Sequence, residues 1–132
     1  MSIKVLLEMY SFHDMPINYI NIDEDSKTII MNIDYYTDED SERIGNASNL
    51  SLHFDNCFFL EFDGNVDFIN SSADEMSGSI LTNEPYTLPN CPLQGVKFFI
   101  QIINYSERDE SYLTLIIVPN QVLVKVIGKN NV

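Results

Sequence analysis

The chain has 132 residues, near the commonest size of a folded domain, so we expect residues 1–132 to form a single domain. Hydrophobic residues make up 45% of the chain and aromatic residues 11%, which excludes a disordered polymer. Twenty acidic residues against seven basic ones give a net charge of −13. This charge argues against direct binding to nucleic acid, because phosphate contacts need a basic surface, and it favours a basic protein as partner.

Apolar spacing in the first half of the chain predicts strands. Residues 3–10 carry a short apolar run that fits either a helix or a strand, and both alternatives stay open. Apolar and polar side chains alternate over residues 28–36, the period of a strand with one buried face. We expect this strand to pair with residues 17–22 across an acidic turn, and residues 50–54 to form a second hairpin with residues 58–62.

The second half begins with an irregular section and ends in three apolar segments. Residues 71–95 contain several prolines and glycines, and we expect a long loop there with one short strand at residues 79–82. Residues 96–105, 112–118 and 122–127 are rich in β-branched and aromatic side chains, and short polar connections separate them. These lengths predict consecutive antiparallel pairing, a C-terminal meander.

Together the segments predict an all-β fold. About eight or nine short antiparallel strands with few helices are typical of a sandwich or a partly open barrel. The N-terminal segment lacks the apolar length of a signal peptide or a membrane span, so we expect a cytoplasmic protein without a membrane partner. Cys57 and Cys91 have no Cys-x-x-Cys spacing, and we expect both to be reduced and neither to bind zinc.

Two histidines lie close in sequence to carboxylates. His13 precedes Asp14, and His53 lies two residues before Asp55; a carboxylate can orient an imidazole that acts as a base or a metal ligand. One hypothesis is therefore a small-molecule or metal-binding β domain with His13 or His53 in a cleft. The alternative is that His53 lies on the solvent face of a strand and that the His13 pair belongs to a turn.

Motifs for catalysis or for a cofactor are missing from the sequence. The acidic run from Asp23 begins like a calcium loop, but Thr28 occupies the position that needs glycine and Asp34 the position that needs glutamate. There is neither a Gly-x-Ser-x-Gly turn nor a glycine-rich phosphate loop. We therefore expect a protein that is not an enzyme and that needs no cofactor or metal.

The acidic residues occur in runs, and we expect these runs to lie in exposed turns. Clustered carboxylates on one surface would suit a basic partner and speed its association, and a neighbouring tyrosine can supply a contact that excludes water. Solvated loops are the alternative interpretation of such runs. The residues that we expect to contact a partner are Asp23, Glu24, Asp25, Tyr36, Asp38, Glu39, Asp40 and Glu42.

Two stretches of the chain carry a resemblance to a known group. The sequence Phe-His-Asp-Met-Pro-Ile over residues 12–17 and the sequence Leu-His-Phe-Asp-Asn over residues 52–56 resemble segments of small bacterial β proteins that include immunity proteins of polymorphic toxin systems. The resemblance implies a protein that binds and neutralises a cognate toxin without catalysis. A basic, nuclease-like toxin would suit the charge. A third hypothesis is a homo-oligomer formed through an exposed sheet edge.

Overall fold

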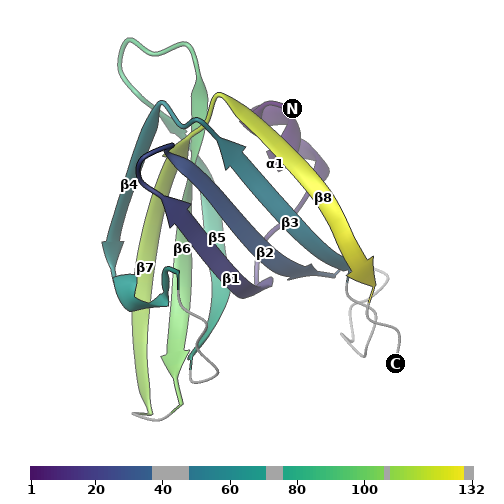
Figure 1. Cartoon of the computed structure of the whole chain (residues 1–132), viewed down its shortest axis with the longest axis vertical. Coiled ribbons are helices and arrows are strands. Elements are labelled where there is room, and N and C mark those ends of the chain that lie inside the picture. Colours follow the sequence, from purple (N-terminus) through teal and green to yellow (C-terminus); the bar gives the residue numbers. More distant parts are fainter. Residues whose placement is uncertain (37–47, 71–75, 106–107, 130–132) are drawn as a thin grey trace.

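The computed structural model describes residues 1–36, 48–70, 76–105 and 108–129 (Figure 1). Within them, eight antiparallel strands form one sheet that is not closed, accompanied by one short α-helix and one turn of 3-10 helix. The predicted all-β class with a partly open architecture is confirmed. In chain order the elements are α1 (Ile3–Met9), β1 (Pro16–Asp23), β2 (Thr28–Tyr35), β3 (Ser48–Asp55), β4 (Phe59–Gly64), η2 (Val66–Phe68), β5 (Met76–Thr87), β6 (Gln94–Asn104), β7 (Asp109–Val118) and β8 (Gln121–Lys129).

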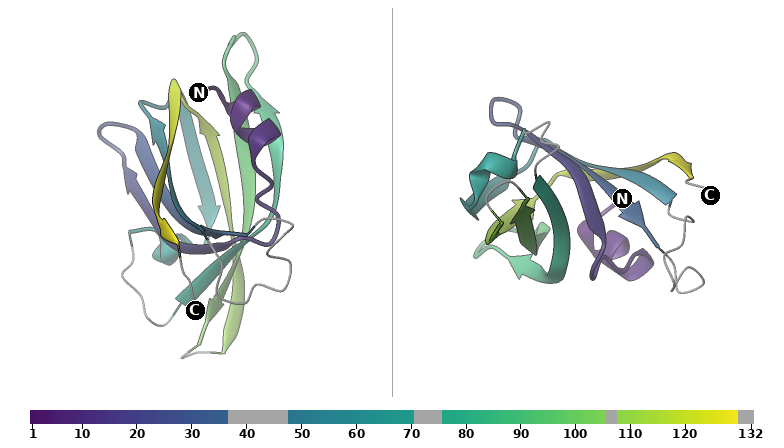
Figure 2. Two further views of the ribbon diagram at one scale, coloured as in Figure 1. Left: turned by 90° about the vertical axis from the view of Figure 1, so that its right-hand side faces the viewer. Right: turned by 90° about the horizontal axis from the view of Figure 1, so that it is seen from below.

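The sheet has two halves that meet at a narrow junction. The strand order is β4-β7-β6-β5-β1-β2-β3-β8, and the sheet is strongly bent between β5 and β1 (Figure 2). Strand β1 pairs with β5 only through Pro16 with Ser79 and Ile17 with Gly78, and then diverges from it. The two halves face each other across the core, so the fold is a sheet folded over on itself and left open at its edges.

Helix α1 resolves the alternative left open for residues 3–10. The hydroxyl of Ser2 caps the helix by accepting from the amide of Val5 at 3.3 Å, and Ile3 and Leu6 are buried. The helix contacts β6 in one half of the sheet and β8 in the other. It therefore covers apolar surface between the two halves (Figure 2).

Inward-facing side chains of both halves form one hydrophobic cluster. On β2 the alternation seen in the sequence is confirmed, because Ile29, Met31 and Ile33 are fully buried. The ring of Phe98 on β6 packs edge-on against Phe12 and Phe54, at 6.2 Å between ring centroids in each pair. These aromatic contacts join β6 to segments of the other half.

The β1–β2 hairpin is confirmed, but the predicted pairing of residues 50–54 with 58–62 is wrong. Strand β3 pairs with β2 and β8, whereas β4 pairs with β7. The chain changes direction at Asn56, whose φ is 47°, and the amide of Phe58 then donates to the carbonyl of Val118 at 2.7 Å. This bond directs β4 onto β7 instead of back along β3.

The predicted meander holds for β6 and β7, which pair along their length, but β8 does not pair with β7. It crosses to the other half and pairs with β3. The connection between β7 and β8 is Pro119 and Asn120, and a tight two-residue hairpin needs a positive φ at its first residue, which proline cannot adopt.

The predicted long loop over residues 71–95 is also wrong in part, because residues 76–87 form the twelve-residue strand β5. Proline is tolerated at Pro85, which pairs with Val96, because β1 begins at Pro16 opposite Ser79 and its pairing does not reach this part of β5. Glycine is required at Gly78, where a Cβ atom would lie 2.7 Å from the ring of Phe68.

Candidate functional site

An acidic groove lies between the end of β1 and the β4–η2 segment. Its volume is about 590 Å³. One wall is the tip of the β1–β2 hairpin, and the other belongs to β4, η2 and the residues that follow η2. The lining residues are Asn21, Ile22, Asp23, Glu24, Asp25, Phe62, Val66, Ile69 and Asn70. We refer to this feature below as the acidic groove.

The acidic wall is organised by the hairpin turn. The carboxylate of Asp23 accepts hydrogen bonds from the backbone amides of Asp25, at 3.0 Å, and Ser26, at 3.3 Å, and so closes the turn. Lys27 completes it with a φ of 53°. Glu24 and Asp25 are exposed at the tip. Asp23 therefore has a structural task, and Glu24 and Asp25 present the negative charge.

The opposite wall is held by Asn70. Beyond Ile17, β1 has no pairing with β5, and the Asn70 side chain takes the place of a neighbouring strand. Its Oδ1 accepts from the amide of Ile22 at 2.8 Å, and its Nδ2 donates to the carbonyl of the same residue at 3.1 Å. Its own amide donates to the carbonyl of Ile20 at 2.8 Å. Asn70 thus fixes the position of β1 against the η2 segment.

We expect the variant Asn70→Ala to lower the free energy of unfolding by about 1–3 kcal/mol, because it leaves the amide and carbonyl of Ile22 without their partners. Alanine is also less tolerant than asparagine of the φ of 58° at this position. Urea denaturation followed by circular dichroism measures the change. Asn21→Ala is the control: it removes an amide from the same groove whose Nδ2 bonds only to the hydroxyl of Tyr19 among the described contacts. Equal losses in the two variants would contradict the role given to Asn70.

Four of the residues that line the acidic groove are apolar. Ile22 is buried, Phe62 and Ile69 are half-buried, and the side chain of Val66 is 44% exposed. Among the described residues that line the groove there is no lysine or arginine. Carboxylates and apolar side chains in one groove match a long basic side chain, whose aliphatic part packs on apolar surface while its charged end meets the carboxylates.

The structure separates the predicted contact residues. Asp23, Glu24 and Asp25 lie together in the acidic groove. Tyr36 follows the opposite end of the eight-residue strand β2, about 25 Å away at the usual strand rise, and its amide contacts the sulfur of Met15 at 3.3 Å. The other predicted contacts, Asp38, Glu39, Asp40 and Glu42, lie outside the described residues.

The sequence did not indicate Phe62, Val66, Ile69 or Asn70 as site residues. Asn70 lies 48 positions from its partner Ile22, and no local signal marks such a contact. One weak signal was available. An asparagine is among the residues that most readily adopt a positive φ, and Asn70 ends the η2 segment in that conformation.

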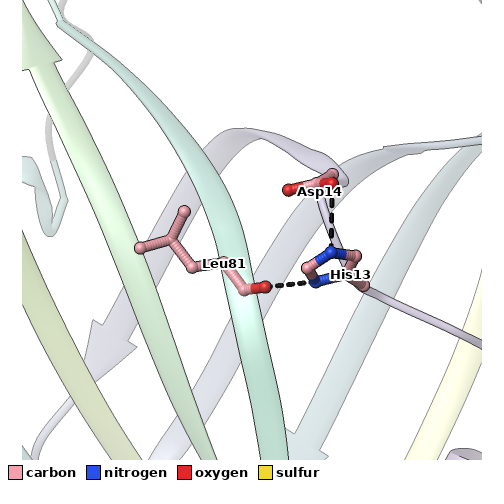
Figure 3. A network of polar contacts seen from close by, with 3 residues as sticks. All are labelled: His13, Asp14 and Leu81. Atoms are coloured by element: carbon pink, nitrogen blue, oxygen red, sulfur yellow. Dashed lines mark hydrogen bonds and ion pairs between the residues drawn. The ribbon is translucent and has the colours of Figure 1, made fainter.

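His13 contacts strand β5 (Figure 3). Its Nδ1 lies 2.5 Å from the carbonyl oxygen of Leu81, and its Nε2 lies 3.2 Å from a carboxylate oxygen of Asp14. Leu81 is the extra residue at the register shift between Ile80 and Thr82 in the pairing of β5 with β6. Because Leu81 has no partner residue on β6, its carbonyl is left for a side-chain donor. The amide of Asp14 also donates to the carbonyl of Ile80, at 2.7 Å. These contacts extend the narrow β1–β5 junction.

Neither histidine lines the acidic groove. The side chains of His13 and Asp14 are 65% and 54% exposed. His53 is half-buried on β3, with its Nε2 at 3.0 Å from the hydroxyl of Ser51. In the part of the chain that the structure describes, no three His, Cys, Asp or Glu side chains gather in a way that could hold a metal ion.

Both cysteines are free, in agreement with the sequence prediction. Burial raises the pKa of the Cys57 thiol to about 11, and the nearby carboxylate of Asp55 adds to the effect. The reactive thiolate of Cys57 is therefore scarce at neutral pH. Cys91 is only half-buried.

We expect one thiol of the native protein to react quickly with Ellman's reagent at pH 8, and two thiols after unfolding in guanidinium. Because deprotonation of Cys57 is disfavoured in the folded state, its reaction should accelerate only as the pH approaches 11. A Cys91→Ser variant assigns the fast signal. Fast reaction of the remaining thiol in that variant would contradict the burial of Cys57.

Comparisons with models of protein families, with curated proteins and with solved structures find no match to this chain. Over the described residues, no helix is long and apolar enough to cross a membrane.

Proposed function

We propose that this protein is a non-catalytic binding protein whose acidic groove accepts a basic segment of another protein. The observation that carries the proposal is that Glu24 and Asp25 line an open groove of about 590 Å³ together with apolar side chains. An arginine or lysine side chain would meet both features at once, because its stem is apolar and its end is charged. The net charge of −13 adds long-range attraction for such a partner.

The specific form that we propose is an immunity protein that neutralises a basic, nuclease-like bacterial toxin. A nuclease needs a basic cleft for phosphate, and an acidic inhibitor can occupy such a cleft. The resemblance of residues 12–17 and 52–56 to immunity proteins supports this form. A cytoplasmic location belongs to the same proposal, and the two free cysteines are consistent with a reducing compartment.

Affinity capture from the lysate of the source cell tests this function. The tagged protein is incubated at low and at high salt, and the retained proteins are identified by mass spectrometry. We expect a basic protein that high salt releases, because screening weakens attraction between exposed charges. The recovered protein is then purified and assayed for nuclease activity with and without this chain.

Two results would contradict the proposal. Recovery of a second copy of this chain alone would favour the homo-oligomer hypothesis. A recovered basic protein whose activity is unchanged by saturating amounts of this chain would leave a binding protein but would refute the inhibitory function.

A further inference from the structure

A second groove lies on the outer face of the β1–β2–β3 sheet, at the other end of the β1–β2 hairpin from the acidic groove. Its volume is about 300 Å³, and its polar lining comes from Asn18, Asn32, Asp34 and Asn49, with Ile127 on β8 as an apolar wall. Asp34 and Asn49 are direct partners across β2 and β3, and Asn32 lies two residues before Asp34 on the same face. We call this feature the amide groove.

Two oxygens in the amide groove lack a hydrogen-bond donor. The Oδ1 atoms of Asn32 and Asn49 are buried and without a partner, and they are the only such side-chain atoms among the described residues. A buried acceptor without a donor is unfavourable, and folded proteins rarely retain one without a reason. Both residues line the same groove, which points to a ligand that supplies donors there.

The groove also carries one carboxylate. One oxygen of Asp34 accepts from Nδ2 of Asn18 at 2.9 Å. The polar lining therefore combines two unpartnered amide oxygens with a negative charge, which suits a ligand that is both a cation and a hydrogen-bond donor. Among the described lining residues there is no basic side chain to fill this role.

The apolar wall distinguishes between kinds of cation. Ile127, which lines the groove, is 59% exposed. A calcium ion would take six to eight oxygen ligands, usually with several carboxylates, and would gain nothing from an isoleucine. A guanidinium group is planar and weakly hydrated, carries five N–H donors at its edge, and tolerates apolar contact on its faces. An ammonium group is compact and more strongly hydrated.

We propose that the amide groove is a binding site for a guanidinium group, supplied either by an arginine side chain of a protein or by a free guanidino compound. Its donors would satisfy the oxygens of Asn32 and Asn49, and its charge would face Asp34. The proposal does not depend on the acidic groove, which lies at the opposite end of the hairpin.

Nuclear magnetic resonance titration of the nitrogen-15-labelled full chain tests the proposal. The probes are arginine capped by acetyl and methylamide groups, free arginine, and lysine capped in the same way. We expect capped arginine to shift the side-chain amide signals of Asn32 and Asn49 saturably, and capped lysine to bind about tenfold more weakly because it offers fewer and differently arranged donors. Tighter binding of capped than of free arginine would indicate a protein as the source, and the reverse order a small molecule.

The variants Asn32→Val and Asn49→Val remove the two oxygens, and each should abolish saturable binding of capped arginine. Valine suits a strand, and the lost acceptor had no donor, so both variants should fold, which circular dichroism checks. Thr28→Val, on the same strand but outside the groove, is the matched control and should bind as the original chain does.

Three results would overturn the proposal. These are unchanged binding in both valine variants, saturation by calcium but not by capped arginine, and shifts centred on the acidic turn at Asp23–Asp25 instead of the amide groove. The last result can be read from the original chain alone. The first two results leave capture of a basic protein by the acidic groove untouched, and the third would support it, so the two proposals fail independently.

Discussion

The variant Phe98→Ala should lower the free energy of unfolding by about 3–5 kcal/mol. Phe98 is fully buried on β6, and its ring contacts Phe12 and Phe54, which belong to the other half of the fold. Truncation removes the burial of the ring and leaves a cavity where the two halves meet. Urea denaturation, followed by far-ultraviolet circular dichroism, measures the loss.

Phe58→Ala is the matched control for this prediction, because the same side chain is 61% exposed at Phe58. We expect it to change stability by less than about 1 kcal/mol. If Phe98→Ala were as mild as Phe58→Ala, contact between the two halves through this aromatic cluster would not be a main source of stability.

The double variant Glu24→Lys/Asp25→Lys should slow association with a basic protein partner by about tenfold or more at low salt. Both carboxylates lie at the exposed tip of the acidic groove, and neither closes the turn. Asp23 is left unchanged because its carboxylate accepts from the amides of Asp25 and Ser26. Stopped-flow kinetics over a series of salt concentrations measures the effect, and the difference should shrink as salt rises.

The control double variant is Glu8→Lys/Glu84→Lys. It reverses the same number of charges at exposed positions on α1 and β5, which do not line the groove. We expect a smaller loss of rate, due to net charge alone. An equal loss in both variants would show that overall charge governs association and that the groove has no special part in it.

Local patterns in the sequence predicted the parts of the fold that local contacts determine. The alternation around Ile29, Met31 and Ile33 identified β2 and its buried face, and the acidic run at Asp23–Asp25 identified the turn. The partners of β4 and β8 could not be predicted in this way. They depend on corners at Asn56 and Pro119, which send each strand to the other half of the sheet.

The candidate site, too, has one part that the sequence predicted and one part that it did not. Its carboxylates are adjacent in sequence and were predicted, whereas the apolar lining at Phe62 and Ile69 comes from a segment distant in sequence. The role of Asn70 depends on the divergence of β1 from β5, which is a property of the folded sheet and has no local signature. The orphaned oxygens of Asn32 and Asn49 are likewise visible only when burial is known.

The most direct measurement of the central claim is hydrogen–deuterium exchange of the complex with the captured basic partner, compared with the free protein. The acidic groove should become protected, so we expect slower exchange in peptides that cover residues 20–26 and 62–70. The main competing surface is the outer face of β6 and β7, where Tyr105 and Tyr112 are 61% and 55% exposed. Protection confined to that face, with unchanged exchange at residues 20–26 and 62–70, would contradict binding through the acidic groove.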